Sequence, residues 1–316
     1  MNVCLKNYTN MKINKKRGLV IHINIMWMIP SFIGHPSFVT RTLNTMIMKK
    51  IISLIVCFFA LTLQAQEQAL FRVTYDCAAL HRESPKTYRW FLDVGKRQSI
   101  FYCPNYRSWS KESAKLKKET DIALALTKIQ QVNTTYGIKN SLEVLIGSPS
   151  ADSYTYINSI RLNRFLYTEK LPEIEWMVTD SVNQVCNYAC KKATAKVYGR
   201  EWSVWYSSDI PVSAGPYVLK GLPGVILEAQ DADNLFHFVA VGIEQLKSDT
   251  PIQVFNEENT LKCTRTKFLK LRKADENRTY KEVGKDLGLN IVNIKDAKGN
   301  DITNKIQSSR NYLDLE

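Results

Sequence analysis

The hydrophobic and polar positions of this chain change period several times, and most of the periods are those of short strands. Three early segments alternate apolar or aromatic residues with polar ones and are separated by polar turns: Phe71–Tyr75, Tyr88–Leu92 and Ser99–Tyr102. This alternation, rich in β-branched and aromatic residues, predicts strands. Between Ser110 and Val132 the apolar residues instead recur at helical spacing, which predicts an amphipathic helix.

The strand pattern returns in the middle of the chain. Its short apolar segments are separated mostly by Gly, Pro, Ser or Asp, and such short links join neighbouring antiparallel strands. The segments are Leu142–Ile146, Ser153–Ile157, Phe165–Tyr167 and Ile174–Val178. They predict an antiparallel meander.

Two hairpins are predicted after residue 190. The first joins Ala193–Val197 to Trp202–Tyr206 through a turn at Gly199. The second joins Val225–Ala229 to Leu235–Ile243. Both strands of the second hairpin are apolar on two faces, so we expect this pair to be central in its sheet.

A last helical pattern covers Thr266–Asp286, with a break expected near Asn277. No repeat, low-complexity linker or charge block marks a boundary between domains. The expected fold class is therefore α+β, mainly β: one domain over residues 67–298, with a curved antiparallel sheet of meander and hairpins and one or two packed amphipathic helices. Residues 299–316 are read as a polar tail.

The N-terminal region has the pattern of an export signal. Two lysines follow Met48, and the apolar run Ile51–Leu63 then leads to a small-residue exit. A single membrane anchor is the alternative, but this run is shorter than the about 20 residues that a span needs. We predict a signal peptide over residues 48–65, cleaved near Gln66. Residues 1–47 hold no acidic residue and are interpreted as an upstream extension outside the fold.

Charge argues against a nucleic-acid partner. The formal net charge is +13, but the first 66 residues hold eight of the basic residues and none of the acidic ones. The mature chain therefore carries a charge of about +5, and its bases are scattered among acids rather than clustered on one face. We expect no nucleic-acid binding and no transmembrane span in the mature chain.

Five cysteines follow the predicted cleavage site, and export would permit disulfides among them. An odd number leaves at least one thiol unpaired in a monomer. Two of them, Cys186 and Cys190, could not bridge on a single extended strand, because their Cα atoms would lie about 13 Å apart against a limit of about 7 Å. Cross-strand pairs are expected instead. The possible disulfide cysteines are Cys77, Cys103, Cys186, Cys190 and Cys263.

The usual catalytic and metal-binding patterns are missing from the sequence. Only His81 and His237 follow the predicted cleavage site, so no histidine-rich zinc site can form from the mature chain. The acidic turn Asp231–Asn234 does not continue as a calcium loop, because Gly242 stands where that loop needs Glu. No phosphate-binding loop and no serine-hydrolase elbow is present either. The sequence therefore predicts no catalytic residue, cofactor or metal.

The segment from Gly215 to Asp231 is the most distinctive part of the chain. Its prolines fix φ and lack an N–H, while its glycines adopt conformations closed to other residues, so its path is strongly constrained. It is predicted to be a loop that leads into the buried strand Val225–Ala229, either as a crossover that defines the fold or as a docking surface. The candidate partner- or ligand-binding residues are Trp205, Pro211, Gly215, Pro216, Tyr217, Gly221, Leu222, Pro223 and Gly224.

The sequence Gly-Leu-Pro-Gly-Val-Ile at residues 221–226 resembles the defining segment of the GLPGLI family. The surrounding frame is also similar, in Cys190-Lys-Lys-Ala193, in Trp205-Tyr206 and in Asp209-Ile-Pro-Val212. The resemblance implies an exported protein of Bacteroidetes-type bacteria without an established activity.

Three functional hypotheses follow. The leading one is a non-enzymatic cell-envelope protein, periplasmic or facing outward, that binds a partner protein or an apolar ligand. The second is an envelope enzyme, such as a hydrolase, whose site is assembled only in three dimensions; a cleft with titratable side chains within hydrogen-bond reach would indicate it. The third is a structural accessory of an outer-membrane receptor complex, which would expose an apolar patch.

Overall fold

The fold is that of a computed structural model, which describes residues 48, 66–81, 84–116, 120–161, 163–247, 249–286, 291–296, 298–304 and 313. The chain divides into two units, residues 1–64 and 65–316. Apart from Met48, the predicted extension and signal peptide lie outside the described residues. The fold below is that of the second unit.

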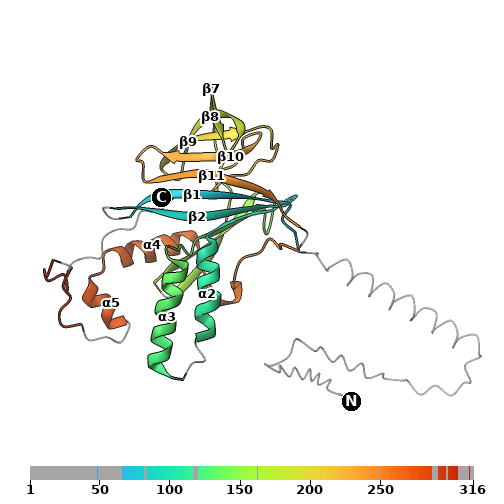
Figure 1. The fold of residues 1–316 in the computed structure, drawn as a ribbon. Helices are drawn as coiled ribbons and strands as arrows, with labels where there is room; N and C mark the ends of the chain where they lie inside the picture. The colour runs from blue at the N-terminus through green and yellow to red at the C-terminus, as the bar shows by residue number, and fades with distance from the viewer. Residues whose placement is uncertain are drawn as a thin grey trace, which may run out of the picture. The chain divides into compact units, whose positions relative to one another are not determined.

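The described strands form one open sheet of twelve (Figure 1). They are β1 Phe71–His81, β2 Ser84–Val94, β3 Ser99–Tyr102, β4 Glu143–Ile146, β5 Ser153–Ile160, β6 Asn163–Lys170, β7 Met177–Val185, β8 Tyr188–Val197, β9 Arg200–Ser207, β10 Val225–Asp231, β11 Phe236–Gln245 and β12 Thr260–Lys262. Their order is β12-β6-β5-β4-β3-β2-β1-β11-β10-β9-β8-β7. The predicted β-rich α+β class is confirmed.

The sheet is mixed rather than wholly antiparallel, which corrects one part of the expectation. The short strand β12 pairs in parallel with β6, through Thr260 beside Arg164 and Lys262 beside Leu166. The other neighbouring strands pair antiparallel. Strand β12 has only three residues and no alternating apolar pattern, so its pairing left no signal in the sequence.

Both predicted hairpins are present. Tyr198 and Gly199, which turn β8 into β9, both have positive φ angles, at 45° and 77°, and positive φ at both turn positions matches the twist of a two-residue hairpin. In the β10–β11 turn, the Asp231 carboxylate accepts a hydrogen bond from the Phe236 N–H at 2.7 Å. Strands β10 and β11 lie inside the sheet, as their apolar faces predicted.

The helices are more numerous than expected. They are α2 Pro104–Leu116, α3 Ile122–Tyr136, α4 Arg265–Glu276 and α5 Tyr280–Asp286, with a 3₁₀ turn η1 at Glu257–Asn259. The single helix predicted over residues 110–132 is in fact two helices. Helix α2 begins at Pro104, a residue suited to a first helical position, and α3 begins after Asp121, whose carboxylate accepts from the Leu124 N–H. The predicted break at Asn277 is confirmed, because α4 ends there.

The sheet curls strongly without closing. Tyr154 stands at the start of β5 and Tyr198 in the turn before β9, seven strands further along the sheet. At about 4.8 Å per strand, a flat sheet would hold them roughly 34 Å apart. Their hydroxyl groups instead share a hydrogen bond of 2.8 Å. The expected curvature is therefore present, and the sheet has an inner face.

Aromatic rings from distant strands meet on that inner face. Trp90 of β2 stacks on Phe101 of β3 with ring centroids 4.7 Å apart, and both contact Phe238 of β11 in edge-to-face geometry.

A buried ion pair joins β9 to β10. Asp231 of β10 forms an ion pair with Arg200 of β9, and both side chains are fully buried. Such a pair is costly to break because either partner alone would leave a buried charge.

Candidate functional site

The distinctive loop is mostly part of the core, not of the surface. Residues 214–219, together with Leu222 and Gly224, are buried. The ring of Tyr217 lies against that of Tyr198, at 6.5 Å between centroids. Among the candidate binding residues, Pro211, Gly221 and Pro223 are exposed and Trp205 is half-buried. The segment is packed as a crossover would be, and its role as a docking surface stays a prediction.

Its glycines stand where the backbone comes close to other atoms. A Cβ on Gly224 would lie 2.0 Å from the Ser207 carbonyl oxygen, and one on Gly215 would lie 2.6 Å from that of Leu219. Gly221 has a φ of +104°, in the region that favours glycine. The Trp176 indole N–H bonds the neighbouring Lys220 carbonyl at 2.9 Å, and Trp176 lies just before β7, which begins three residues later than the predicted segment.

All five cysteines of the second unit are free thiols in the structure, and their pairing stays a prediction. Cys77, Cys103 and Cys190 are buried, while Cys186 and Cys263 are partly buried. Burial raises the pKa of each thiol above its ordinary value. A thiolate nucleophile needs the opposite shift.

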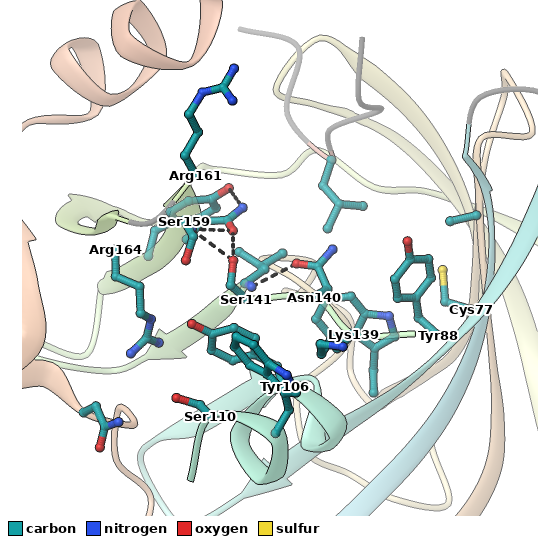
Figure 2. Close-up of a pocket in the computed structure, with 18 of the residues that line it drawn as sticks. Cys77, Tyr88, Tyr106, Ser110, Lys139, Asn140, Ser141, Ser159, Arg161 and Arg164 are labelled. Carbon is teal, nitrogen blue, oxygen red and sulfur yellow. Dashed lines mark hydrogen bonds between the residues drawn. The ribbon is translucent and has the colours of Figure 1, made fainter. Parts of the chain in front are cut away.

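The main cavity of the described residues lies elsewhere, between the inner face of the sheet and helix α2 (Figure 2). Its volume is about 790 Å³, which lies within the range of about 300–1,000 Å³ found for small-molecule sites. The sheet side is formed by alternate residues of three neighbouring strands, which point to the same face. These residues are Cys77 and Ala79 of β1, Tyr88 and Trp90 of β2, and Phe236 and Phe238 of β11.

Helix α2 supplies the opposite wall with one of its faces. The lining residues recur at the spacing of neighbouring helical turns. They are Tyr106, Trp109, Ser110, Ser113 and Ala114. The Trp109 indole N–H bonds the Asn133 side chain of α3 at 2.8 Å, which fixes the ring and joins the two helices. None of the described residues of α2 is fully buried, because its inward face borders the cavity.

Amides and hydroxyls form a third side. Asn140 and Ser141 precede β4, and Asn158 and Ser159 lie at the end of β5 (Figure 2). The Ser141 hydroxyl donates to the Asn158 side-chain oxygen at 2.7 Å, and the Asn158 amide donates to the Tyr156 hydroxyl at 3.2 Å. These side chains hold one another in place, so their remaining donors and acceptors are preorganised.

The charged lining residues are all basic. Lys139 follows α3, and its ammonium lies 5.2 Å from the centre of the Trp109 ring. Arg164 of β6 donates to the buried Glu143 carboxylate at 3.3 Å, and Arg161 pairs with Asp275 of α4. Burial lowers the pKa of Lys139 from its ordinary value, while Cys103 acts in the opposite direction.

The described lining of the cavity is mainly aromatic, amide, hydroxyl and basic. Among the described residues that border the cavity, none is Asp, Glu or His. An acid–base hydrolytic pair, such as two carboxylates, is therefore missing from its described walls. His237 pairs with Glu228 outside the cavity, at 2.8 Å, and the described residues contain no cluster of His, Cys, Asp or Glu fit for a metal. Flat aromatic rings beside fixed amides and hydroxyls suit a ligand that is apolar on its faces and polar at its edges.

Sequence reasoning missed every one of these residues except Cys77, which it had considered only as a possible disulfide partner. The residues come from segments between positions 77 and 313, and no short motif joins them. One local signal existed: the aromatic and small residues Tyr106, Trp109, Ser110 and Ser113 repeat on one helical face. That stripe was hidden because the helix was predicted to begin at Ser110.

Comparison with known proteins gives one family match. A family model described as "N-glycanase peptide, N-terminal domain" matches residues 151–266, less than half of the chain. Two solved structures of PNGF-II, in space groups C2 and P21, match at 14% identity with TM-scores of 0.44 and 0.45. The matches cover 64% and 72% of this chain and 32% and 37% of those structures, so the chain spans about a third of their length. No curated protein matches the sequence.

The family match corrects the family expected from the sequence. The GLPGLI-like segment at 221–226 lies inside the matched range, and the family found there is the N-glycanase N-terminal domain. The resemblance to the GLPGLI family was therefore wrong. A short Gly- and Pro-rich motif indicates only a local backbone conformation, here one that brings Gly224 close to Ser207. Chains of different families can share such a conformation, so the motif does not define the family. The match favours the envelope-enzyme hypothesis over a non-enzymatic binding protein.

Proposed function

We propose that this protein acts in the enzymatic removal of N-linked glycans and that the cavity beside α2 binds the carbohydrate. The match to an N-glycanase N-terminal domain supports the first half of this proposal. The matched residues 151–266 include nine of the 23 described lining residues of the cavity. These residues are Tyr156, Asn158, Ser159, Arg161, Arg164, Phe236, Phe238, Asn256 and Asn259.

The carbohydrate part of the proposal rests on the lining itself. A pyranose ring has apolar C–H faces and a rim of hydroxyl groups. Trp109 and Tyr88 offer aromatic surfaces for the faces, and both are only partly buried. Asn140 and Asn158 offer amides for the rim. Two aromatic walls with polar groups between them match one ring of this kind better than a purely apolar ligand.

The proposal gives the cavity a binding role and names no catalytic residue within it. Its described walls lack the carboxylate or imidazole that would activate water. Hydrolysis of the glycan linkage is therefore assigned to residues outside this cavity. The cavity binds the sugar and presents the linkage to those residues.

The decisive observation is the pairing of aromatic surface and fixed amides, and it can be tested by binding. Isothermal titration of the full mature chain with an N-glycopeptide should show saturable binding, and the same peptide without its glycan should not bind. Trp109→Ala should weaken binding about tenfold, close to 1.4 kcal/mol. Trp205→Ala is the matched control, since Trp205 is also half-buried but lies outside the cavity. Equal losses in both variants, or equal binding of the bare peptide, would contradict the proposal.

Enzymatic action needs its own measurement. The mature chain would be incubated with the glycopeptide, and the released glycan followed by mass spectrometry. Release that falls with Trp109→Ala and not with Trp205→Ala would support a glycan-cleaving enzyme. Binding without release would assign this chain the carbohydrate-binding part alone, and the enzymatic half of the proposal would fail.

We also propose export, which is supported by the pattern of residues 48–65. Among the described residues, no helix is long and apolar enough to cross a membrane. N-terminal sequencing of secreted or periplasmic material tests the proposal. A mature start near Gln66 is expected, and a start well before it would contradict cleavage at this site.

A further inference from the structure

The charge of the cavity narrows the class of its ligand. Three basic side chains border it, Lys139, Arg161 and Arg164, and no acidic side chain is among its described lining residues. A neutral sugar does not need this arrangement. Basic side chains brought together without acids favour a ligand that carries negative charge.

One buried carboxylate, that of Glu143, lies behind the cavity and pairs with two arginines, Arg107 and Arg164. Glu143 is almost fully buried and accepts from Arg107 at 2.7 Å and from Arg164 at 3.3 Å. It also accepts from the Phe255 N–H at 3.1 Å. One carboxylate therefore faces two guanidinium groups, which leaves about one positive charge uncompensated within this cluster.

Arg164 is buried and leaves one N–H group of its guanidinium without a hydrogen-bond partner among the described residues. Its side chain is only 9% exposed, its Nη2 bonds Glu143 and its Nη1 bonds the Phe255 carbonyl. Its Nε has no hydrogen-bond partner among the described residues. The guanidinium lies 5.6 Å from the centre of the Tyr106 ring, on the cavity side, and Figure 2 shows the two residues beside each other. The Nε is shielded from solvent, so Arg164 contributes positive charge beside the cavity rather than an accessible donor.

Lys139 supplies the second positive group. Its ammonium donates to the Gly137 carbonyl at 3.2 Å and rests over Trp109. Its described contacts include no carboxylate. Arg161 differs, because its charge is matched by Asp275. Among the described lining bases, Lys139 is therefore the one whose described contacts lack a carboxylate, while Arg164 shares Glu143 with Arg107.

We propose that the cavity binds an anionic sugar, a saccharide that carries a carboxylate or a sulfate group, with its ring against Trp109 and its negative group at Lys139. Arg164, beside Tyr106, adds to the positive potential of the cavity. This inference rests on the proposed carbohydrate-binding function and specifies its substrate class. The two anions share charge and acceptor chemistry, and the experiment below separates them.

The test compares three glycans on the full mature chain by isothermal titration: a sialylated N-glycan, the same glycan after removal of its sialic acid, and a sulfated N-glycan. At low salt we expect the best anionic glycan to bind at least tenfold more tightly than the neutral one. Raising the salt concentration should reduce this preference, because screening weakens charge attraction. The tighter of the two anionic glycans identifies the preferred group.

Variants separate a specific site from the general positive charge of the chain. Lys139→Gln should remove most of the preference for the anionic glycan while leaving neutral binding nearly unchanged, and Lys139→Arg should retain it. Lys96→Gln removes an equal charge from an exposed turn outside the cavity and should leave the preference intact.

Each result decides a different claim. Equal affinity for all three glycans overturns the anionic-sugar inference and leaves the carbohydrate function standing. A preference that Lys139→Gln and Lys96→Gln reduce equally also overturns it, because general charge then explains the binding. Failure of every glycan to bind overturns the proposed carbohydrate site as well.

Discussion

The inner face of the curled sheet is treated differently at its two ends. At one end, residues 214–222 fold onto the face and bury Tyr217, Leu219 and Leu222. At the other end, α2 stands over the face and leaves the cavity open. The two ends belong to one surface, because Tyr154 and Tyr156 are two residues apart on β5 and so point to the same face. Tyr154 contacts Tyr198, which in turn contacts Tyr217 of the loop. Tyr156 lines the cavity.

The comparison separates structure-forming from ligand-binding chemistry. The loop has little regular structure, yet it is buried more deeply than the regular helix α2, of which no described residue is fully buried. Apolar side chains of the loop, such as Leu219, pack on the sheet face and exclude water from it. The inward face of α2 carries serines and half-exposed aromatic rings, and burying its polar groups without hydrogen bonds would be costly. The space beside α2 therefore suits a ligand ring that carries polar groups.

The largest expected effect is at the filled end. Leu219 is fully buried, so Leu219→Ala should lower the free energy of unfolding by about 2–5 kcal/mol. Urea denaturation measures this change. Glycan affinity of the folded fraction should be unchanged, because Leu219 is not part of the cavity lining. A loss below about 0.5 kcal/mol would show that the loop covers the face without stabilising it.

A smaller loss is expected where the loop backbone touches β9. Gly224→Ala places a methyl group 2.0 Å from the Ser207 carbonyl oxygen, so the strands must shift, at a cost of about 1–3 kcal/mol. Thermal unfolding measures this cost. Gly242→Ala is the matched control, since a Cβ at Gly242 meets nothing within 4 Å.

Gly221→Val tests the conformational argument separately. The φ of +104° at Gly221 is strained for any side chain, and we expect a loss of about 1 kcal/mol or more in the free energy of unfolding. If both Gly221→Val and Gly224→Ala melt like the parent protein, neither glycine is required and the loop is not a constrained crossover.

The two ends also differ in how far the sequence predicted them. The path of the loop was predictable because its constraints are local: proline fixes φ, glycine permits close approach, and the apolar run Val225–Ala229 follows directly. Most of the strands and both hairpins were predicted for the same reason, from alternation and turn residues in neighbouring positions, and the short β12 was not. What the motif could not supply was the family or the role, since Tyr217 and Leu222, read as possible docking residues, are buried.

The cavity was not predictable because its residues meet only through the curl of the sheet. Nothing in the sequence places Trp109 near Phe238, or Lys139 near Asn158, before the register of β1, β2 and β11 is known. Basic residues spread among acids along the chain argued against a basic face for nucleic acid and did not reveal this smaller cluster. Folding gathers Lys139, Arg161 and Arg164 at one cavity and leaves Glu143 and Asp275, the partners of the two arginines, outside its lining. Charge counted along a chain says little about charge arranged in space.

The smallest expected effect tests whether the open end is open for a ligand. Ala114 is an exposed residue of α2 that borders the cavity. Ala114→Trp should fill part of the space and weaken glycan binding about tenfold, while unfolding changes by less than about 0.5 kcal/mol because the site is exposed. Ala123→Trp makes the same change on an exposed position of α3 outside the cavity and should bind like the parent. If Ala114→Trp instead raises stability and leaves binding intact, the space beside α2 is an incompletely packed part of the core, and the two ends of the inner face differ in packing alone.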